Sequence, residues 1–394
     1  MSDIQKIRRN LETGWIQFLN LNYKKISTKN FSGATPPSIF VGHTGYPKVK
    51  IGPLTPPLHG DTSLLDSPER WLGKSLEEIA NFRLSLVSGS FDMNIYDLSG
   101  KNIEILQELA MSKKSVESEL LFEKTPISLI DQKKLDLDTD PIIFGFKAPL
   151  KNFKISSLST DKRLENAFYD TDQYAKETIV KLYNQGVEIS KIIRIFSMGM
   201  LGIKKNRKLV PTRWSISSID YTISINLIKG LQKFSKIESY NVYQYHHLGN
   251  YYVIILIPYD SWLFEMQEGW LNINGIVKID GDYEDICKPE NKPNILGAFF
   301  AGRLASTEHL TKIKKKAAVM IFREILPQYV VPVGVWQVRE GVRNALKRQC
   351  KEFEDFEGAL SFAFSLLSIS KKEWLKNSKI YKSLTKDKKI LDYF

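Results

Sequence analysis

Proline and glycine residues between positions 32 and 60 set the strongest limit on how this chain can fold. In the stretch SGATPPSIFVGHTGYPKVKIGPLTPPLHG they leave only two short extended runs, 38–41 and 48–51. Proline lacks a backbone N–H donor, and it disfavours helix both at its own position and at the preceding residue. We therefore predict a folded loop system, which acts either as a structural clasp over a sheet or as a binding surface.

Helical and extended patterns follow one another irregularly along the rest of the chain. Apolar spacing predicts helices over 67–84, 172–186, 190–199, 306–326 and 337–352, strands at 91–96 and 142–146, and a hairpin of 241–246 with 251–258. Because these elements show no regular βαβ alternation, we predict an α+β fold with mixed sheets and packed helices. Ser370 and Glu373 have the spacing of a capping box at the start of a last helix.

A chain of 394 residues is too long for one ordinary core. We predict a two-domain body and a short C-terminal tail. The first domain covers residues 1–160 and contains the loop system, the second covers 161–370, and the basic tail covers 371–394.

The charge balance favours a polyanionic partner, because 56 Lys and Arg face 44 Asp and Glu, for a net charge of +12. Two cysteines exclude a disulfide framework and a thiolate-rich zinc site, and the five histidines are scattered, so we expect no zinc site. The most apolar stretch, 251–258, is far shorter than the roughly 20 residues of a membrane span. We expect a soluble, cytoplasmic protein with no membrane partner.

Five cations follow two glycines in the segment 199–215. Cations at this density would bind the phosphates of DNA, and Trp214 would stack on a base. The alternative is a solvated basic turn with Trp214 in the core. The candidate DNA-binding residues are Lys204, Lys205, Arg207, Lys208 and Arg213.

Acidic residues provide weaker candidates for catalysis. Glu265 and the DGDYE run with Asp280 and Asp282 offer hard oxygen ligands for Mg²⁺, although such a run is equally a polar turn. Arg303, Arg323 and Arg339 lie near acids in sequence, which indicates structural ion pairs or a phosphate site. Sequence alone does not establish catalysis.

The last residues form the most informative short motif. Ile390 precedes the adjacent aromatics Tyr393 and Phe394 by the spacing of the box that binds the replication sliding clamp, which this pattern resembles. Asp387 occupies the position where that box usually has glutamine. The three apolar residues are the candidate clamp-binding residues. The alternative is a tail folded back onto its own domain.

Several long blocks of the sequence resemble the archaeal Nre family of DNA repair proteins. The family resemblance implies a role in surviving DNA damage and binding to the sliding clamp through a C-terminal box. Many family members have a cysteine-rich N-terminus, which this chain lacks because its first cysteine is Cys287. The blocks lie at 36–54, 75–89, 207–220, 249–265, 301–310 and 332–346.

These observations predict a DNA repair factor that binds DNA through a basic surface and is recruited to the sliding clamp by its C-terminal motif. The alternative is a metal-dependent, structure-specific nuclease or another DNA-processing enzyme that uses Glu265, Asp280 and Asp282 with Mg²⁺.

Overall fold

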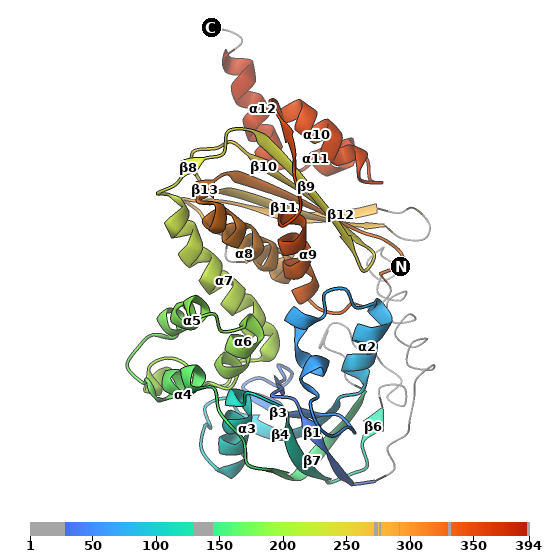
Figure 1. Ribbon diagram of the computed structural model, residues 1–394, viewed down its shortest axis with the longest axis vertical. Coiled ribbons are helices and arrows are strands. Elements are labelled where there is room, and N and C mark those ends of the chain that lie inside the picture. Colours follow the sequence, from blue (N-terminus) through green and yellow to red (C-terminus); the bar gives the residue numbers. More distant parts are fainter. Residues whose placement is uncertain are drawn as a thin grey trace. The chain divides into compact units, whose positions relative to one another are not determined.

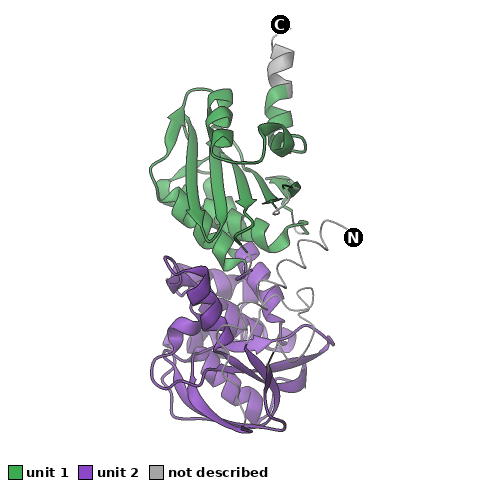
Figure 2. Cartoon of the chain, turned by 90° about the vertical axis from the view of Figure 1, so that its right-hand side faces the viewer, with its two compact units in different colours: residues 1–7, 223–330, 335–394 green, residues 8–222, 331–334 purple. Residues whose placement is uncertain are grey.

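The computed structural model describes residues 28–128, 145–271, 275, 277–290, 292–329 and 332–391, with side chains up to residue 385. The chain forms two compact units (Figure 2). Unit 1 contains residues 1–7, 223–330 and 335–394, and unit 2 contains residues 8–222 and 331–334. The predicted α+β class is confirmed, since each unit combines a sheet with helices. Residue 160 lies inside unit 2, and the predicted domains 1–160, 161–370 and 371–394 stay a prediction.

The sheet of unit 2 has the strand order β1-β5-β7-β4-β3-β2, with β6 paired to β7. Among the described strand pairs of this sheet, only β4 and β7 are parallel. The two predicted runs within the loop system are the neighbouring strands β2 and β3. The strands are β1 Asn30–Thr35, β2 Ile39–Val41, β3 Lys48–Thr55, β4 Val87–Asn94, β5 Val116–Phe122, β6 Ile127–Ser128 and β7 Phe146–Ile155.

The helices of unit 2 begin and end where local chemistry dictates. The predicted helix over 67–84 begins only at residue 76, because Ser75 and Glu78 form a reciprocal capping box and Gly73 has a φ of 82°. Gly186, at a φ of 71°, follows α5 as predicted. The helices are α2 Leu76–Leu84, α3 Lys101–Met111, α4 Lys162–Tyr169, α5 Ala175–Asn184 and α6 Ile189–Ser197, with 3-10 turns η1 Ser63–Asp66, η2 Pro68–Arg70 and η3 Lys204–Asn206.

Helix α7, Thr212–Leu231, begins in unit 2 and ends in unit 1, whose main sheet has the order β12-β11-β14-β10-β9-β15. The predicted hairpin is confirmed as β9 and β10, with a turn at Leu248 and Gly249 in the left-handed region. The strands are β9 Tyr240–His247, β10 Asn250–Ile257, β11 Leu263–Leu271, β12 Val277–Asp285, β14 Ala318–Ile325 and β15 Lys351–Phe353, and a separate pair joins β8 Ser235–Lys236 to β13 Lys315–Lys316.

The predicted helix over 306–326 is wrong in its second half. Helix α8, Leu296–Ile313, ends at Lys314, which has a φ of 53°, and the apolar run after it is the central strand β14. A short continuous apolar run fits a buried strand as well as a buried helix. The predicted helix over 337–352 is α9, Trp336–Leu346, followed by β15.

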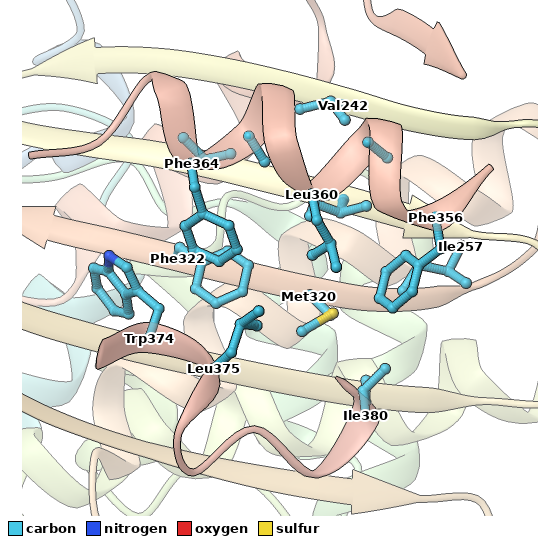
Figure 3. Close-up of a cluster of buried hydrophobic side chains, with 14 of the residues drawn as sticks. Val242, Ile257, Met320, Phe322, Phe356, Leu360, Phe364, Trp374, Leu375 and Ile380 are labelled. Carbon is cyan, nitrogen blue, oxygen red and sulfur yellow. The ribbon is translucent and has the colours of Figure 1, made fainter. Parts of the chain in front are cut away.

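Helices cover both faces of the main sheet of unit 1 (Figure 1). Helices α8 and α9 pack on one face. On the other face, α10 Phe356–Ser365, α11 Lys371–Leu375 and the start of α12 Lys379–Leu391 enclose an apolar core that includes Met320, Phe322 and Trp374 (Figure 3). Ser370 accepts a hydrogen bond from the Glu373 N–H and so caps α11, not the last helix. Among the described helices, none is both long enough and apolar enough to cross a membrane.

Candidate nucleic-acid interface

The predicted basic segment lies on the surface of unit 2. Lys204 and Lys205 lie on the turn η3, Lys208 follows it, and all three side chains are exposed. Within the described part of the chain, no carboxylate lies within ion-pair distance of these three lysines. Arg213, in the first turn of α7, is also exposed. The positive charge of the three lysines is therefore available to an anionic ligand.

Arg207 differs from its neighbours because its side chain faces inward. Its guanidinium donates hydrogen bonds of 2.7 Å to the carbonyl oxygens of Gly202, Phe168 and Asp170, and its Cζ lies 5.6 Å from the Phe168 ring centroid. Burial lowers the pKa of Arg207, although the nearby Asp170 opposes this effect. The residue thus fastens the basic segment to the end of α4.

Three exposed aromatic rings accompany the cations. Tyr46 and Trp214 are each 43% exposed, and their ring centroids lie 5.1 Å apart with a tilt of 54°. Tyr96 is 67% exposed, and the Lys208 Nζ atom lies 5.8 Å from its ring centroid. Trp214 is therefore not a core residue, and the alternative that placed it in the core is wrong.

Backbone hydrogen bonds hold the segments that carry these rings. The Ile95 N–H donates to the Pro47 carbonyl at 3.0 Å, and the Leu209 N–H donates to the Ile95 carbonyl at 2.8 Å. The Val41 N–H donates to the Thr212 hydroxyl at 3.0 Å. The loop before β3, the end of β4 and the start of α7 therefore lie next to one another. We define the aromatic–basic surface as Tyr46, Tyr96, Lys204, Lys205, Lys208, Arg213 and Trp214.

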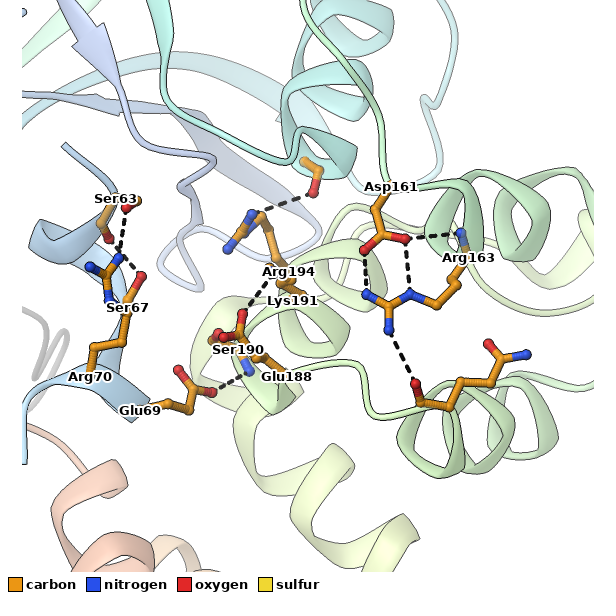
Figure 4. A network of polar contacts seen from close by, with 12 residues as sticks. Ser63, Ser67, Glu69, Arg70, Asp161, Arg163, Glu188, Ser190, Lys191 and Arg194 are labelled. Atoms are coloured by element: carbon orange, nitrogen blue, oxygen red, sulfur yellow. Dashed lines mark hydrogen bonds and ion pairs between the residues drawn. The ribbon is translucent and has the colours of Figure 1, made fainter. Parts of the chain in front are cut away.

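Other charged residues of unit 2 serve internal contacts (Figure 4). Asp161 accepts bonds from Arg163 Nε at 3.0 Å and Nη2 at 2.6 Å, and Arg163 Nη1 reaches the Gln185 carbonyl. Glu69 accepts the Ser190 N–H at 2.9 Å, which ties η2 to the start of α6. Cations such as Arg163 are therefore structural, in contrast to Lys204 and its neighbours.

The structure does not bring the three candidate acids together. Residues directly opposite in β11 and β12 share a face, so Asp280 and Asp282 lie with Glu268 and Met266, on the face that α8 covers. Glu265 points to the other face, where its Oε2 accepts the N–H groups of Lys379 and Ile380 at 2.8 Å each. Among the described residues, no group of three His, Cys, Asp or Glu side chains is arranged to hold a metal ion.

Each candidate acid has a local structural partner. Burial raises the pKa of Glu265, whose Oε1 also accepts a bond from Gln267 at 2.6 Å. Asp282 accepts the Ile295 N–H at 2.9 Å before α8. Asp280 accepts the Gly281 N–H at 2.9 Å and lies 3.9 Å from the Lys278 Nζ atom.

The candidate arginines of unit 1 are buried, and Arg303 and Arg323 form ion pairs. Arg303 Nη1 lies 2.6 Å from Glu284 Oε2, with both side chains 0% exposed. Arg323 pairs with Glu268 and also donates to Asn250 Oδ1 at 2.9 Å. Arg339 is 3% exposed in α9. The expectation of structural ion pairs fits Arg303 and Arg323.

The candidate clamp motif lies at and beyond the end of α12. Tyr393 and Phe394 are outside the described residues, and of Asp387 and Ile390 only the helical backbone is described. The clamp-binding role of Ile390, Tyr393 and Phe394 therefore stays a prediction.

Sequence reasoning did not find Tyr46 and Tyr96. The available signal was an aromatic residue inside each of two turns, GYP and YDLSG, where little core exists to fill. Their closeness to Lys208 and Trp214 depends on the pairing of β3 with β4, which no local pattern reveals.

Known protein families and proteins match this chain along most of its length. The family model described as "Archaeal Nre, N-terminal" matches residues 15–274, and "Archaeal Nre, C-terminal" matches residues 284–393. The chain is 34% identical over 360 residues to DNA repair protein NreB of Archaeoglobus fulgidus, which covers 90% of each chain. It is 34% identical over 347 residues to NreA of the same organism, which covers 86% of this chain and 85% of that one. No solved structure matches.

Proposed function

This chain belongs to the archaeal Nre family, and from that membership we propose that it acts in DNA repair and binds DNA through the aromatic–basic surface. The relatives are named DNA repair proteins, and the chain spans nearly their whole length.

One observation carries the proposal: Lys204, Lys205 and Lys208 are exposed together and have no carboxylate partner in the described part of the chain. A lysine that contacts a phosphate releases a condensed counterion, so binding weakens as salt rises. Each such contact adds about −0.9 to the slope of log K against log salt on duplex DNA and about −0.7 on single strands. Arg207 adds rigidity, because its guanidinium is occupied by carbonyl oxygens.

Charge reversal tests this proposal. The triple variant Lys204→Glu, Lys205→Glu, Lys208→Glu should bind a labelled oligonucleotide at least about tenfold more weakly than the wild type at 100 mM salt, with a shallower salt slope, by fluorescence anisotropy. The matched control reverses the exposed residues Lys113, Lys114 and Lys162 of the same unit. Equal loss in both triple variants would show a general charge effect and contradict the assignment of this surface.

The C-terminal motif supplies the second part of the proposed function. We propose that Ile390, Tyr393 and Phe394 dock into the apolar pocket of the replication sliding clamp and tether the protein there. Tethering raises the local concentration of the aromatic–basic surface at DNA, so neither contact has to be tight by itself. Family membership and the match of the C-terminal model up to residue 393 support this part.

Calorimetry with the purified clamp tests the tether. Phe394→Ala should weaken binding by about 2 kcal/mol, which is roughly thirtyfold, because an aromatic anchor supplies much of the energy of such a contact. Lys382→Ala, at an exposed position earlier in α12, is the control and should bind as the wild type does. Unchanged affinity of Phe394→Ala would remove the tether from the proposal and leave the DNA-binding surface untouched.

A further inference from the structure

We infer that the aromatic–basic surface binds single-stranded DNA, with bases stacked on its exposed rings. This inference rests on the proposed DNA binding and adds the form of DNA that the surface accepts.

The exposed rings are the first reason. Tyr46, Tyr96 and Trp214 are among the large apolar side chains that remain exposed in unit 2, with 43%, 67% and 43% of their surface open. A lone exposed aromatic needs no explanation, but these three lie on segments joined by backbone hydrogen bonds. A platform of fixed rings is what proteins use to hold unstacked bases.

The second reason is that stacking separates single strands from duplexes. In a duplex, each base already stacks on its neighbours, so no base face is free to contact Tyr96 or Trp214. Duplex recognition instead uses side chains that reach base edges or phosphates. Exposed rings thus add affinity for a single strand and none for an intact duplex.

The third reason is the order of rings and cations along the surface. Lys208 lies beside Tyr96 and Trp214 lies beside Tyr46, and the two positions are six residues apart, at most about 20 Å along the chain. A short oligonucleotide therefore reaches both. Alternating rings and cations match alternating bases and phosphates.

The pattern continues at the Lys204 end of the surface. The Lys204 N–H donates to the Thr171 carbonyl at 3.1 Å, which joins η3 to the loop before α5. In that loop Tyr174 is 56% exposed, and the Lys176 Nζ atom lies 5.7 Å from its ring centroid. A further ring with its own cation thus follows the lysines.

Nearby acids make DNA binding at the Tyr96 end of the surface depend less on charge and more on base stacking. Asp92 and Asp97 are exposed at the end of β4 and just beyond it, and Asp97 directly follows Tyr96 in the sequence. They repel phosphates at that end of the surface. Binding at Tyr96 should accordingly depend on the ring more than on charge, and should persist better as salt increases.

The experiment compares a 20-nucleotide poly-dT strand with a 20-base-pair duplex, both labelled, by anisotropy at 100 and 300 mM salt. Trp214→Ala and Tyr96→Ala should each weaken single-strand binding about tenfold and change duplex binding less than twofold. Trp214→Phe and Tyr96→Phe should retain most of the affinity, because they keep a ring. Leu58→Ala, which shortens a side chain 50% exposed in the same unit, is the control.

The outcomes separate this inference from the proposed function. If charge reversal of the three lysines weakens binding while both ring-to-alanine variants bind single strands normally, the DNA-binding surface stands and base stacking fails. Equal loss on duplex and single strand in the ring variants also overturns stacking. If the wild type binds neither DNA, the proposed DNA binding fails and the inference fails with it. Thermal melting of each variant shows that loss of binding is not loss of fold.

Discussion

In unit 1, Arg303 and Glu284 form an ion pair of which neither side chain reaches solvent, whereas in unit 2 Lys204, Lys205 and Lys208 are exposed and have no carboxylate partner among the described residues. Both regions contain charged residues, but these residues have different roles. In the buried pair, each charged group neutralises the other inside the core, where an unpaired charge would be destabilising. The exposed lysines remain free to exchange water and counterions for phosphates.

The comparison teaches that a partner within the fold, not charge density, separates structural cations from those that we propose bind DNA. Arg207 lies between the two extremes, since it is next to Lys208 in sequence but donates to three carbonyl oxygens. Removing a cation should therefore affect stability in proportion to its burial and affect DNA binding in the opposite order. Substitutions at Arg303, Arg207 and Lys208 test this contrast, and a substitution at Glu265 tests a buried carboxylate.

The largest effect is expected at Arg303. Arg303→Ala leaves the Glu284 carboxylate buried without its cation, which should lower the free energy of unfolding by about 3–5 kcal/mol. Urea unfolding followed by circular dichroism measures this loss. Arg303→Met combined with Glu284→Gln removes both charges and should lose clearly less. A double variant as unstable as Arg303→Ala would show that packing, not the buried charge, is the cause.

A smaller effect is expected at Arg207. Arg207→Ala removes a charged donor from the carbonyl oxygens of Gly202, Phe168 and Asp170, and should lower the stability of unit 2 by about 2 kcal/mol. Lys208→Ala, at the next position, should change stability by less than about 0.5 kcal/mol. Thermal unfolding measures both values. If Lys208→Ala is the less stable of the two, the distinction between inward and outward cations fails.

A small effect that depends on pH is expected at Glu265. Glu265→Gln keeps an acceptor for the N–H groups of Lys379 and Ile380, so it should change stability by less than about 1 kcal/mol at pH 7. Burial raises the pKa of Glu265 above the ordinary 4.5 of the unfolded chain, so the folded state holds the proton more tightly. That contribution to stability is fully present below pH 4.5 and is lost as pH rises through the folded-state pKa.

Compared with Glu265→Gln, the wild type should thus gain stability as pH falls from 7 towards 4.5. Urea midpoints at several pH values measure the difference. Glu354→Gln changes an exposed carboxylate of the same unit and is the control. A difference between wild type and Glu265→Gln that is constant with pH would contradict the raised pKa.

Local patterns predicted those elements whose signals lie within a few residues. The hairpin at Leu248 and Gly249 has a turn that favours the left-handed region, and Gly186 ends α5 where a helix is expected to end. The predicted helix over 306–326 continues past the end of α8, because that end is marked by Lys314 in the left-handed region and not by a glycine. The strand after it is buried on both faces, and its first five residues, 318–322, are all apolar, so the sequence shows no alternation there.

The candidate surface was predictable only in part. The lysines and Trp214 form one run in the sequence, so their density was visible. Tyr46 and Tyr96 lie about 50 residues apart, and only the pairing of β3 with β4 brings their segments together. The inward turn of Arg207 depends on carbonyl groups more than 30 residues earlier, at Phe168 and Asp170, which no spacing rule identifies.

The link between Glu265 and α12 gives the C-terminal helix a fixed base. The first two N–H groups of α12 donate to a side chain of the interior strand β11. The helix therefore starts at a point that is fixed to the sheet. Its 13 residues extend about 20 Å from that base. A partner that grips the far end would hold unit 1 on a short rigid arm, so that the length of α12 sets the stand-off distance.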